Sequence, residues 1–247
     1  MRVGVFDSGV GGLTVVKSLL THKLFKEIIY YGDTARVPYG TKDKNTIIRY
    51  SLEVLEFFKN FDIDMLIVAC NTASAYALDE LRANTDIPIV GVIESGILSM
   101  EKSLPNKESN ILILGTQATI NSNKYQDALN EKGYKNITSI ATGLFVPIVE
   151  EQLQNTSILE HTFDHYFKDL KDVDGVILGC THFPLIQNQI SNYLDGVLTI
   201  HSGEAIVQYL ESNYQCDNSF DKTDIQFFAS SNPDGLKDVA DKWLRDI

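Results

Sequence analysis

Two stretches of the chain that resemble each other determine the fold that we expect: Ile67-Val68-Ala69-Cys70-Asn71-Thr72 and Ile177-Leu178-Gly179-Cys180-Thr181-His182. Each begins with an apolar run typical of a buried strand, reaches a cysteine and continues into polar residues. Three further pairs of segments repeat: Val3–Ser8 with Ile111–Thr116, Val37-Pro38 with Val146-Pro147, and Ser95-Gly96 with Ser202-Gly203, so that all four offsets lie between 107 and 110 residues. The shared offset predicts two similarly built units.

Apolar, β-branched runs alternate with helical stretches along the chain. Continuous apolar strands that alternate with helices are typical of parallel sheets with helices on both faces. We therefore expect an α/β fold with two similar doubly wound lobes and mainly parallel sheets. Because ligands of such sheets bind beyond the carboxyl ends of the strands, we expect the active site in the cleft between the lobes. The expected strands are Arg2–Phe6, Ile28–Tyr31, Met65–Ala69, Ile89–Ile93, Ile111–Leu114, Ile137–Ala141, Gly175–Leu178, Leu198–Ile200 and Ile225–Phe228.

The expected lobes are discontinuous in sequence. We assign residues 1–93 and 208–247 to the first α/β lobe and residues 94–207 to the second. The strand Ile225–Phe228 and the helix after Pro233 are expected to return and complete the first lobe.

One helix is expected at Lys44–Asn60. Its residues Ile48, Leu52, Leu55 and Lys59 fall on one face. Three apolar side chains and a lysine stem at this spacing are typical of an amphipathic helix on a sheet.

Composition limits the classes of partner. The 247 residues carry a formal net charge of −12, and an acidic surface repels phosphate backbones, so nucleic acid is a poor partner. Backbone amides still permit a small anionic substrate. The apolar run at the N-terminus is too short for a signal peptide, and no apolar stretch is long enough for a membrane helix. We therefore expect a soluble, cytoplasmic protein without a membrane partner.

The chain has three cysteines, Cys70, Cys180 and Cys216. An odd number without a secretion signal argues against a disulfide framework, and no two have CxxC spacing. We expect neither a zinc ribbon nor any other metal site. Cys216 lies in a polar stretch, where we expect no functional role.

Cys70 and Cys180 each end a strand and are expected near a helix N-terminus, a position that favours a thiolate. An alternative is that both are small buried hydrophobic residues, as free cysteines often are. Two thiols on opposite sides of a carbon suit one reaction in particular. If one removes a proton and the other donates one to the opposite face, the configuration inverts. Hydrolysis or acyl transfer needs only one nucleophile.

Three polar elements accompany the cysteines. The loop Asp7-Ser8-Gly9-Val10-Gly11-Gly12 matches neither a dinucleotide-binding nor a P-loop pattern. Its glycines either let backbone amides approach a ligand or form a tight turn that Asp7 caps. His182 either hydrogen-bonds the thiol or substrate or is structural. Glu150, just after the repeated Val-Pro pair, is expected at a helix start and is either functional or solvated.

Together these segments resemble the glutamate racemases of the aspartate/glutamate racemase superfamily. The resemblance extends over nearly the whole chain, in the expected order. Its segments are Phe6–Thr14, Gly32-Asp33, Pro38-Tyr39-Gly40, Ala69–Ser74, Gly91–Glu94, Gly115-Thr116, Thr119-Ile120, Phe145-Val146-Pro147 with Glu150, and Gly179–His182.

The resemblance implies an isomerase that interconverts L- and D-glutamate without pyridoxal phosphate or metal and supplies D-glutamate for peptidoglycan in cell wall biogenesis. It also implies a homodimer. By motif position, Cys70 and Cys180 are the two acid/base residues, one for each enantiomer. Asp7 and His182 resemble the polar assistants of the thiols, and Glu150 is a further catalytic candidate. The matched substrate-binding positions are Ser8, Pro38, Tyr39, Gly40, Asn71, Thr72, Thr116, Thr119 and Thr181.

Two positions depart from the family pattern. Ser95 stands where the family often has proline, and His201 stands where aspartate often precedes Ser-Gly. Both are expected at lobe junctions, where they bear on the hinge rather than on the chemistry. Because the chain begins at the first expected strand, we also expect no N-terminal extension of the kind that accompanies activation by a cell-wall precursor in some relatives.

Three alternatives stay open from the sequence. An aspartate or hydantoin racemase would use the same thiol pair. A two-lobed small-molecule binding module would bind a ligand without chemistry, and it gives no reason for two matched cysteines. A single-cysteine hydrolase or transferase would be indifferent to loss of the second thiol.

Overall fold

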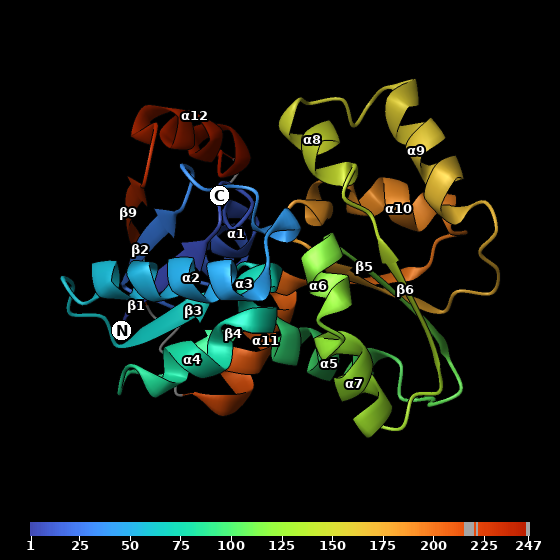
Figure 1. The fold of residues 1–247 in the computed structure, drawn as a ribbon, viewed down its shortest axis with the longest axis horizontal. Coiled ribbons are helices and arrows are strands. Elements are labelled where there is room, and N and C mark those ends of the chain that lie inside the picture. Colours follow the sequence, from blue (N-terminus) through green and yellow to red (C-terminus); the bar gives the residue numbers. More distant parts are fainter. Residues whose placement is uncertain (215–219, 221, 246–247) are drawn as a thin grey trace.

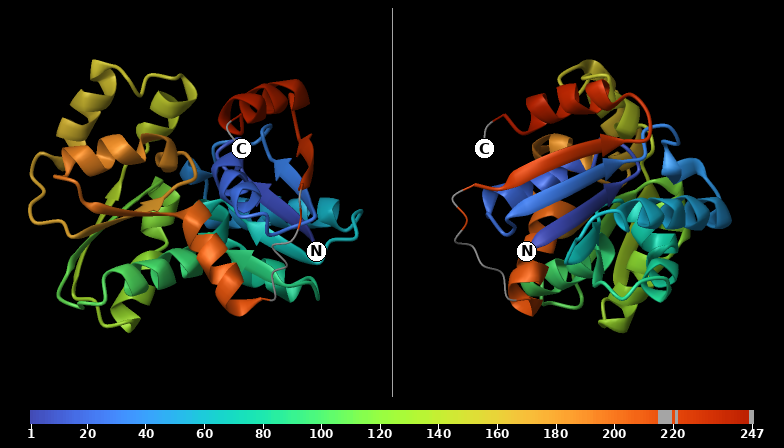
Figure 2. Two further views of the ribbon diagram at one scale, coloured as in Figure 1. Left: turned by 180° about the vertical axis from the view of Figure 1, so that it is seen from behind. Right: turned by 90° about the vertical axis from the view of Figure 1, so that its left-hand side faces the viewer.

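The computed structural model describes residues 1–214, 220 and 222–245, so Cys216 lies outside the described residues. Figure 1 shows two α/β halves side by side, and we call each sheet with the helices that cover it a lobe. The first strand and the last helix both belong to the first lobe (Figure 2). Within the described ranges, no helix combines the length and the apolar character needed to cross a membrane.

Within the described residues, the first sheet has five parallel strands in the order β4-β3-β1-β2-β9, and the second has four in the order β6-β5-β7-β8. Read from β8, the second sheet repeats the order β4-β3-β1-β2 with each strand replaced by its sequence counterpart. The expected α/β fold with two similar parallel sheets is confirmed. The strands are β1 (Arg2–Asp7), β2 (Glu27–Gly32), β3 (Met65–Val68), β4 (Ile89–Gly91), β5 (Asn110–Gly115), β6 (Asn136–Ala141), β7 (Gly175–Gly179), β8 (Leu198–His201) and β9 (Asp224–Ala229).

Helices form most of the connections between these strands. The α-helices are α1 (Leu13–Thr21), α2 (Lys44–Phe58), α3 (Asn71–Tyr76), α4 (Leu78–Ala83), α5 (Val92–Ser103), α6 (Gln117–Asn121), α7 (Lys124–Glu131), α8 (Phe145–Glu150), α9 (Ser157–Phe167), α10 (Gln187–Tyr193), α11 (Ser202–Asn213) and α12 (Pro233–Trp243). Two short 3₁₀ helices are found among the described residues, η1 (Tyr39–Thr41) and η2 (Phe183–Ile186).

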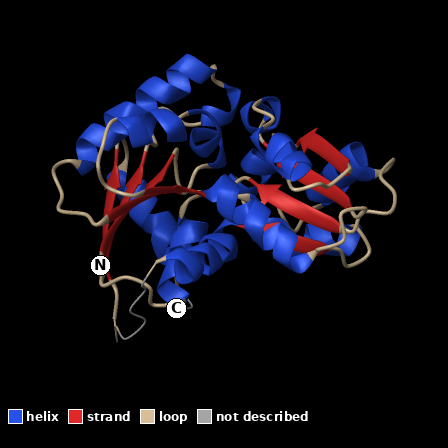
Figure 3. Cartoon of the chain, turned by 90° about the horizontal axis from the view of Figure 1, so that it is seen from below, coloured by secondary structure: helices blue, strands red, loops and turns tan. Residues whose placement is uncertain are grey.

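Both faces of each sheet are covered, as Figure 3 shows. Successive residues of a strand point to opposite sides, so each strand contributes to two cores. In β1, Val3 and Val5 pack with α1, α11 and α12, whereas Phe6 packs with α2, α3 and α4. In β5, Leu112 faces the core with α8, α9 and α10, and Ile111 faces the core with α5 and α7.

The two lobes exchange one helix each. Helix α5 follows β4 of the first sheet, yet Ile97 and Met100 pack in a core of the second sheet. Helix α11 follows β8 of the second sheet, yet Ile206 and Leu210 are buried in a core of the first. Burial of one such side chain contributes roughly 1.5–3 kcal/mol. Helices α5 and α11 also pack on each other (Figure 1), so the chain crosses between the lobes at two neighbouring helices.

The bounds of the lobes stay a prediction. Strand β9 pairs with β2, so the chain does return to the first sheet. The expected boundary between residues 207 and 208 nevertheless falls inside α11, which begins at Ser202.

Three local expectations were wrong. Glu150, expected at a helix start, is the last residue of α8, because this helix already begins at Phe145. The strand expected at Ile89–Ile93 ends at Gly91, because Val92 already begins α5. Helix α2 ends at Phe58 and turns a different face to the sheet. Its buried residues are Ile47, Ser51, Val54, Leu55 and Phe58, whereas Lys59 is exposed. The aromatic ring of Phe58, which packs with Phe6 of β1, lies outside the face that the sequence pattern predicts to be buried.

Gly203 of α11 allows this helix to approach α1 closely. A Cβ atom at this position would lie 2.5 Å from Ser18 Oγ and 3.1 Å from the Thr14 carbonyl oxygen. We therefore expect Gly203→Ala to lower the free energy of unfolding by about 1–3 kcal/mol, measured by urea denaturation. Gly143→Ala is the control, because a Cβ there meets nothing within 4 Å. Equal losses in the two variants would contradict this packing.

Candidate active site

Cys70 and Cys180 occupy matching places in the two lobes. Cys70 ends the loop after β3 and is the N-cap residue of α3, and Cys180 directly follows β7 and precedes η2. Carboxyl ends of parallel strands share one edge of a sheet, and here the two edges face the same cavity of about 30 Å³. The lining residues are Ser8, Val37, Pro38, Tyr39, Gly40, Cys70, Asn71, Thr72, Thr116, Val146, Gly179, Cys180, Thr181 and His182.

The surroundings of Cys70 favour the neutral, protonated form of its thiol. Its thiol donates to Ser8 Oγ at 3.6 Å, and its sulfur accepts from the Ala73 backbone N–H at 3.5 Å. Burial raises the pKa of this thiol to about 12, and the charges of Asp7 and, more weakly, Cys180 act in the same direction. Cys70 is therefore a proton donor at neutral pH.

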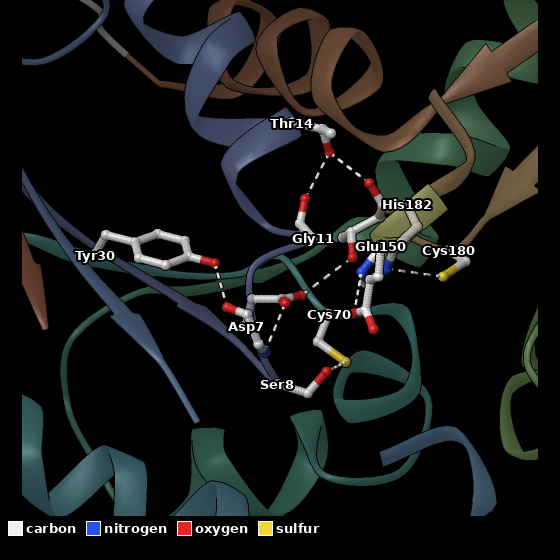
Figure 4. A network of polar contacts seen from close by, with 11 residues as sticks. Asp7, Ser8, Gly11, Thr14, Tyr30, Cys70, Glu150, Cys180 and His182 are labelled. Atoms are coloured by element: carbon white, nitrogen blue, oxygen red, sulfur yellow. Dashed lines mark hydrogen bonds and ion pairs between the residues drawn. The ribbon is translucent and has the colours of Figure 1, made fainter. Parts of the chain in front are cut away.

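Cys180 belongs to a chain of three side chains. His182 Nδ1 lies 3.8 Å from Cys180 Sγ, and His182 Nε2 lies 2.9 Å from Glu150 Oε1 at the end of α8 (Figure 4). Burial lowers the pKa of His182, but the hydrogen bonds to Cys180 and Glu150 outweigh burial and raise it to about 10. The imidazole is therefore positively charged at neutral pH and has an acidic partner on one side and a thiol on the other.

Asp7 links the two lobes. It ends β1 and is fully buried; Oδ2 accepts the Gly9 backbone N–H at 2.9 Å, and Oδ1 accepts the Thr181 hydroxyl at 3.3 Å. Burial raises the pKa of Asp7, and the charge of His182 lowers it. The carboxylate thus acts on Cys70 through its charge, while one of its hydrogen bonds goes to the loop of Cys180 (Figure 4).

Three threonines form a hydroxyl cluster beside Cys70. Thr72 Oγ1 lies 2.9 Å from Thr116 Oγ1 and 3.1 Å from Thr119 Oγ1. Thr72 lies in the first turn of α3 in the first lobe, whereas Thr116 caps α6 in the second. Next to them, the Asn71 side-chain amide donates to Ser202 Oγ at 3.2 Å and accepts from Tyr125 Oη at 2.7 Å. The start of α3 is therefore held by both lobes.

The loop that carries Tyr39 forms another wall. The Tyr39 hydroxyl donates to Asp33, which also forms an ion pair with Arg36 at 2.8 Å. Gly40 packs on Thr116, since a Cβ at Gly40 would lie 2.5 Å from Thr116 Cβ. The loop thus reaches across to the second lobe.

Most of the sequence-predicted site residues line the cavity. Asp7, Thr119 and Glu150 stand behind it and contact residues of the lining. Sequence reasoning missed Val37, Val146 and Gly179 as lining residues. The repeated Val-Pro pair was a signal for the two valines, but spacing alone did not indicate a wall of the site.

The two departures from the family pattern lie away from the cavity. Ser95 is buried in the first turn of α5 and donates to the Val92 carbonyl at 3.0 Å. His201 is the N-cap residue of α11; burial lowers its pKa, and its Nδ1 has no hydrogen-bond partner within the described residues.

The described residues that line the cavity include no lysine or arginine. Across the part of the chain that the structure describes, no group of three or more His, Cys, Asp or Glu residues could hold a metal ion. The polar groups available to a ligand are hydroxyls, amides, thiols and one imidazole.

The raised pKa of His182 predicts a pH-dependent stability. Below about pH 6.5 both folded and unfolded chains hold this proton; above it the unfolded chain releases it first, until the folded chain follows near pH 10. The free energy of unfolding should therefore fall across this window, by up to about 1.4 kcal/mol per pH unit for one proton.

Urea denaturation at neutral pH and at a mildly alkaline pH, below the usual pKa of cysteine, measures this slope. His182→Gln should reduce it, whereas His22→Gln, on the surface beside Glu204, should not. An unchanged slope in His182→Gln would refute the assignment.

A family model and a similar protein of known function indicate the same family. The model of the Asp/Glu/hydantoin racemases matches residues 15–210. Glutamate racemase of a Nitratiruptor species is 59% identical over 247 residues, which are 100% of this chain and 97% of that protein.

Solved structures that are similar to this chain belong to glutamate racemases as well. The crystal structure of glutamate racemase from Campylobacter jejuni subsp. jejuni has a TM-score of 0.98 at 52% identity and covers 99% of this chain and 98% of that chain. The structure from Francisella tularensis in complex with D-glutamate has a TM-score of 0.87 at 33% identity, over 99% of this chain and 93% of that chain. The chain therefore belongs to the aspartate/glutamate/hydantoin racemase family.

Proposed function

We propose that the chain interconverts L- and D-glutamate by carrying the α-proton between Cys70 and Cys180. The observation that carries the proposal is the pair of thiols at matching strand ends of two sheets, both lining one cavity. The relatives named above, glutamate racemases at 33% to 59% identity over nearly the whole chain, support glutamate as the substrate.

Racemisation needs a base on one face of Cα and an acid on the other. One sulfur takes the α-proton, and the electron pair of the broken C–H bond stays on Cα. The opposite thiol then delivers its proton to the other face, which inverts the configuration. In the reverse direction the two sulfurs exchange roles. Since Cys70 and Cys180 come from different lobes, each can serve one face.

The surroundings of the two thiols differ. The raised pKa of Cys70 keeps it as a thiol, the form that donates. The raised pKa of His182 keeps its ring cationic, 3.8 Å from Cys180 Sγ, where it can donate a hydrogen bond to a thiolate. Glu150 holds the far nitrogen and balances the charge. We therefore assign His182 and Glu150 to Cys180, and the charge of Asp7 to Cys70.

Hydroxyl and amide groups, with backbone N–H groups, are proposed to hold the carboxylates and ammonium of glutamate. Thr119 supports this set from behind through Thr72 and Thr116. The groups in contact with substrate would be Ser8, Pro38, Tyr39, Gly40, Asn71, Thr72, Thr116 and Thr181.

The size of the cavity bears on substrate entry. About 30 Å³ accommodates one or two water molecules, far less than an amino acid. Glutamate therefore enters only after the lobes or the loops around the cavity move apart. Closure around the substrate then excludes water from the reacting carbon.

We extend the proposal to the cellular role. The resemblance of the motifs supports supply of D-glutamate for peptidoglycan, a cytoplasmic location, a homodimer and a reaction without cofactor or metal. Each of these stays a prediction.

We expect purified protein to incorporate deuterium at Cα and to racemise L-glutamate in deuterium oxide without added cofactor, as measured by proton NMR and circular dichroism. Cys70→Ala and Cys180→Ala should each lower racemisation by roughly 100- to 10,000-fold, because one face loses its proton carrier. Any remaining exchange should be confined to one enantiomer, and the two variants should choose opposite ones.

Cys216→Ala is the control and should retain activity. Full activity in either of the other two variants would disprove the two-thiol mechanism. If activity were lost in only one of these two variants and the other cysteine-to-alanine variant kept it, and if a covalent acyl-thiol formed, the protein would be a hydrolase or transferase instead.

Substrate choice has its own test. We expect kcat/KM for glutamate to exceed that for aspartate, because the matched loops are those of glutamate racemases. Faster turnover of aspartate would keep the thiol mechanism and change the substrate. Ligand binding without exchange of either amino acid would favour a binding module.

A further inference from the structure

Thr14 joins the first lobe to the loop of the second thiol. It lies on α1, is 8% exposed, and its hydroxyl donates to the carbonyl oxygen of Thr181 at 2.8 Å (Figure 4). Thr181 stands between Cys180 and His182. The Thr14 hydroxyl also lies 2.9 Å from the carbonyl oxygen of Gly11, just before α1.

The hydrogen bonds of η2 explain why the Thr181 carbonyl needs a donor from elsewhere. In this 3₁₀ turn, Phe183 N–H donates to the Cys180 carbonyl and Leu185 N–H to the His182 carbonyl, both at 3.1 Å. The donor to the Thr181 carbonyl in the same pattern would be residue 184. That residue is Pro184, which has no N–H. The hydroxyl of Thr14 supplies the missing donor.

The Gly11 carbonyl does not depend on this hydroxyl. It already accepts the backbone N–H of Thr14 at 3.0 Å. A hydroxyl has a single proton to donate. The Thr14 hydroxyl can donate it to the Thr181 carbonyl, because the Gly11 carbonyl already accepts the Thr14 N–H.

Thr181 is held at two points by the first lobe. Thr14 holds its carbonyl, and Asp7 accepts its hydroxyl at 3.3 Å. Gly11 presses on the same segment, since a Cβ there would lie 2.2 Å from Thr181 Oγ1 and 2.7 Å from His182 Nδ1. These contacts set where the Cys180–His182 segment lies relative to the first lobe and Cys70.

We propose that Thr14 is a positioning residue for the reaction. Its hydroxyl replaces the N–H that Pro184 lacks and thereby orients Cys180 and His182. The inference rests on the two-thiol mechanism proposed above. Thr14 does not line the cavity, so its effect passes through the Thr181 backbone.

The first test compares Thr14→Val, which keeps the shape and removes the hydroxyl, with Thr14→Ser, which keeps the hydroxyl. We expect kcat to fall about tenfold in Thr14→Val, since a buried carbonyl loses its donor, with KM changed less than about twofold. Thr14→Ser should stay within about threefold of the parent. Thr21→Val is the matched control, because Thr21 on the same helix makes an exposed bond to the Lys17 carbonyl at 2.9 Å.

A second test restores the donor from the other side. Pro184→Ala places an N–H at residue 184, where the 3₁₀ turn can use it. In that background, Thr14→Val should cost less than about threefold in kcat, so the double-mutant cycle should show coupling. Equal costs in both backgrounds would overturn the proposal, as would an equal loss in Thr14→Ser and Thr14→Val.

A readout independent of turnover follows the thiols themselves. The rate at which iodoacetamide alkylates each cysteine can be followed by mass spectrometry. In Thr14→Val this rate should differ severalfold from that of the parent protein at Cys180 and little at Cys70. Equal changes at both cysteines would indicate general loosening and overturn the proposal. If the parent protein fails to racemise glutamate, the proposed function is wrong, whereas the alkylation rates still decide the Thr14 contact.

Discussion

The site depends on one contact, the close packing of the loop Asp7–Gly12 against Thr181 and His182. Each sheet alone presents one thiol, and one thiol can serve only one face of a carbon. The absence of a side chain at Gly11 brings the loop close enough for Asp7 and Thr14 to hydrogen-bond with Thr181. The two sequence-distant thiols thereby line one cavity.

Another part of the lobe contact is apolar and less directional. The exchanged helices α5 and α11 bury Met100 and Leu210 in the cores of opposite sheets. Hydrophobic burial resists separation of the lobes but tolerates small rotations, because it depends on area rather than on angle. The polar contacts around Thr181 require defined distances. The lobe contact thus combines directional polar contacts with apolar burial.

Burial and charge together set the protonation states of Cys70 and His182. In a chain of net charge −12, an anionic substrate meets local donors rather than the overall field. Desolvation keeps Cys70 protonated, while Glu150 and Cys180 keep His182 charged in spite of its burial. Environments that separate the protonation preferences of two neighbouring groups are typical of acid/base sites.

The sequence by itself determined the strands, except for the end of the strand at Ile89–Gly91, their division between two similar units, and the positions of Cys70 and Cys180 after strands, because apolar runs and repeats are local signals. Periodicity alone could not choose the buried face of α2, where Phe58 packs on the sheet. Only the tertiary structure decided that Glu150 reaches His182, and that Thr14 meets a carbonyl 167 residues away. Such partners depend on how two lobes pack, and no local propensity extends over that distance.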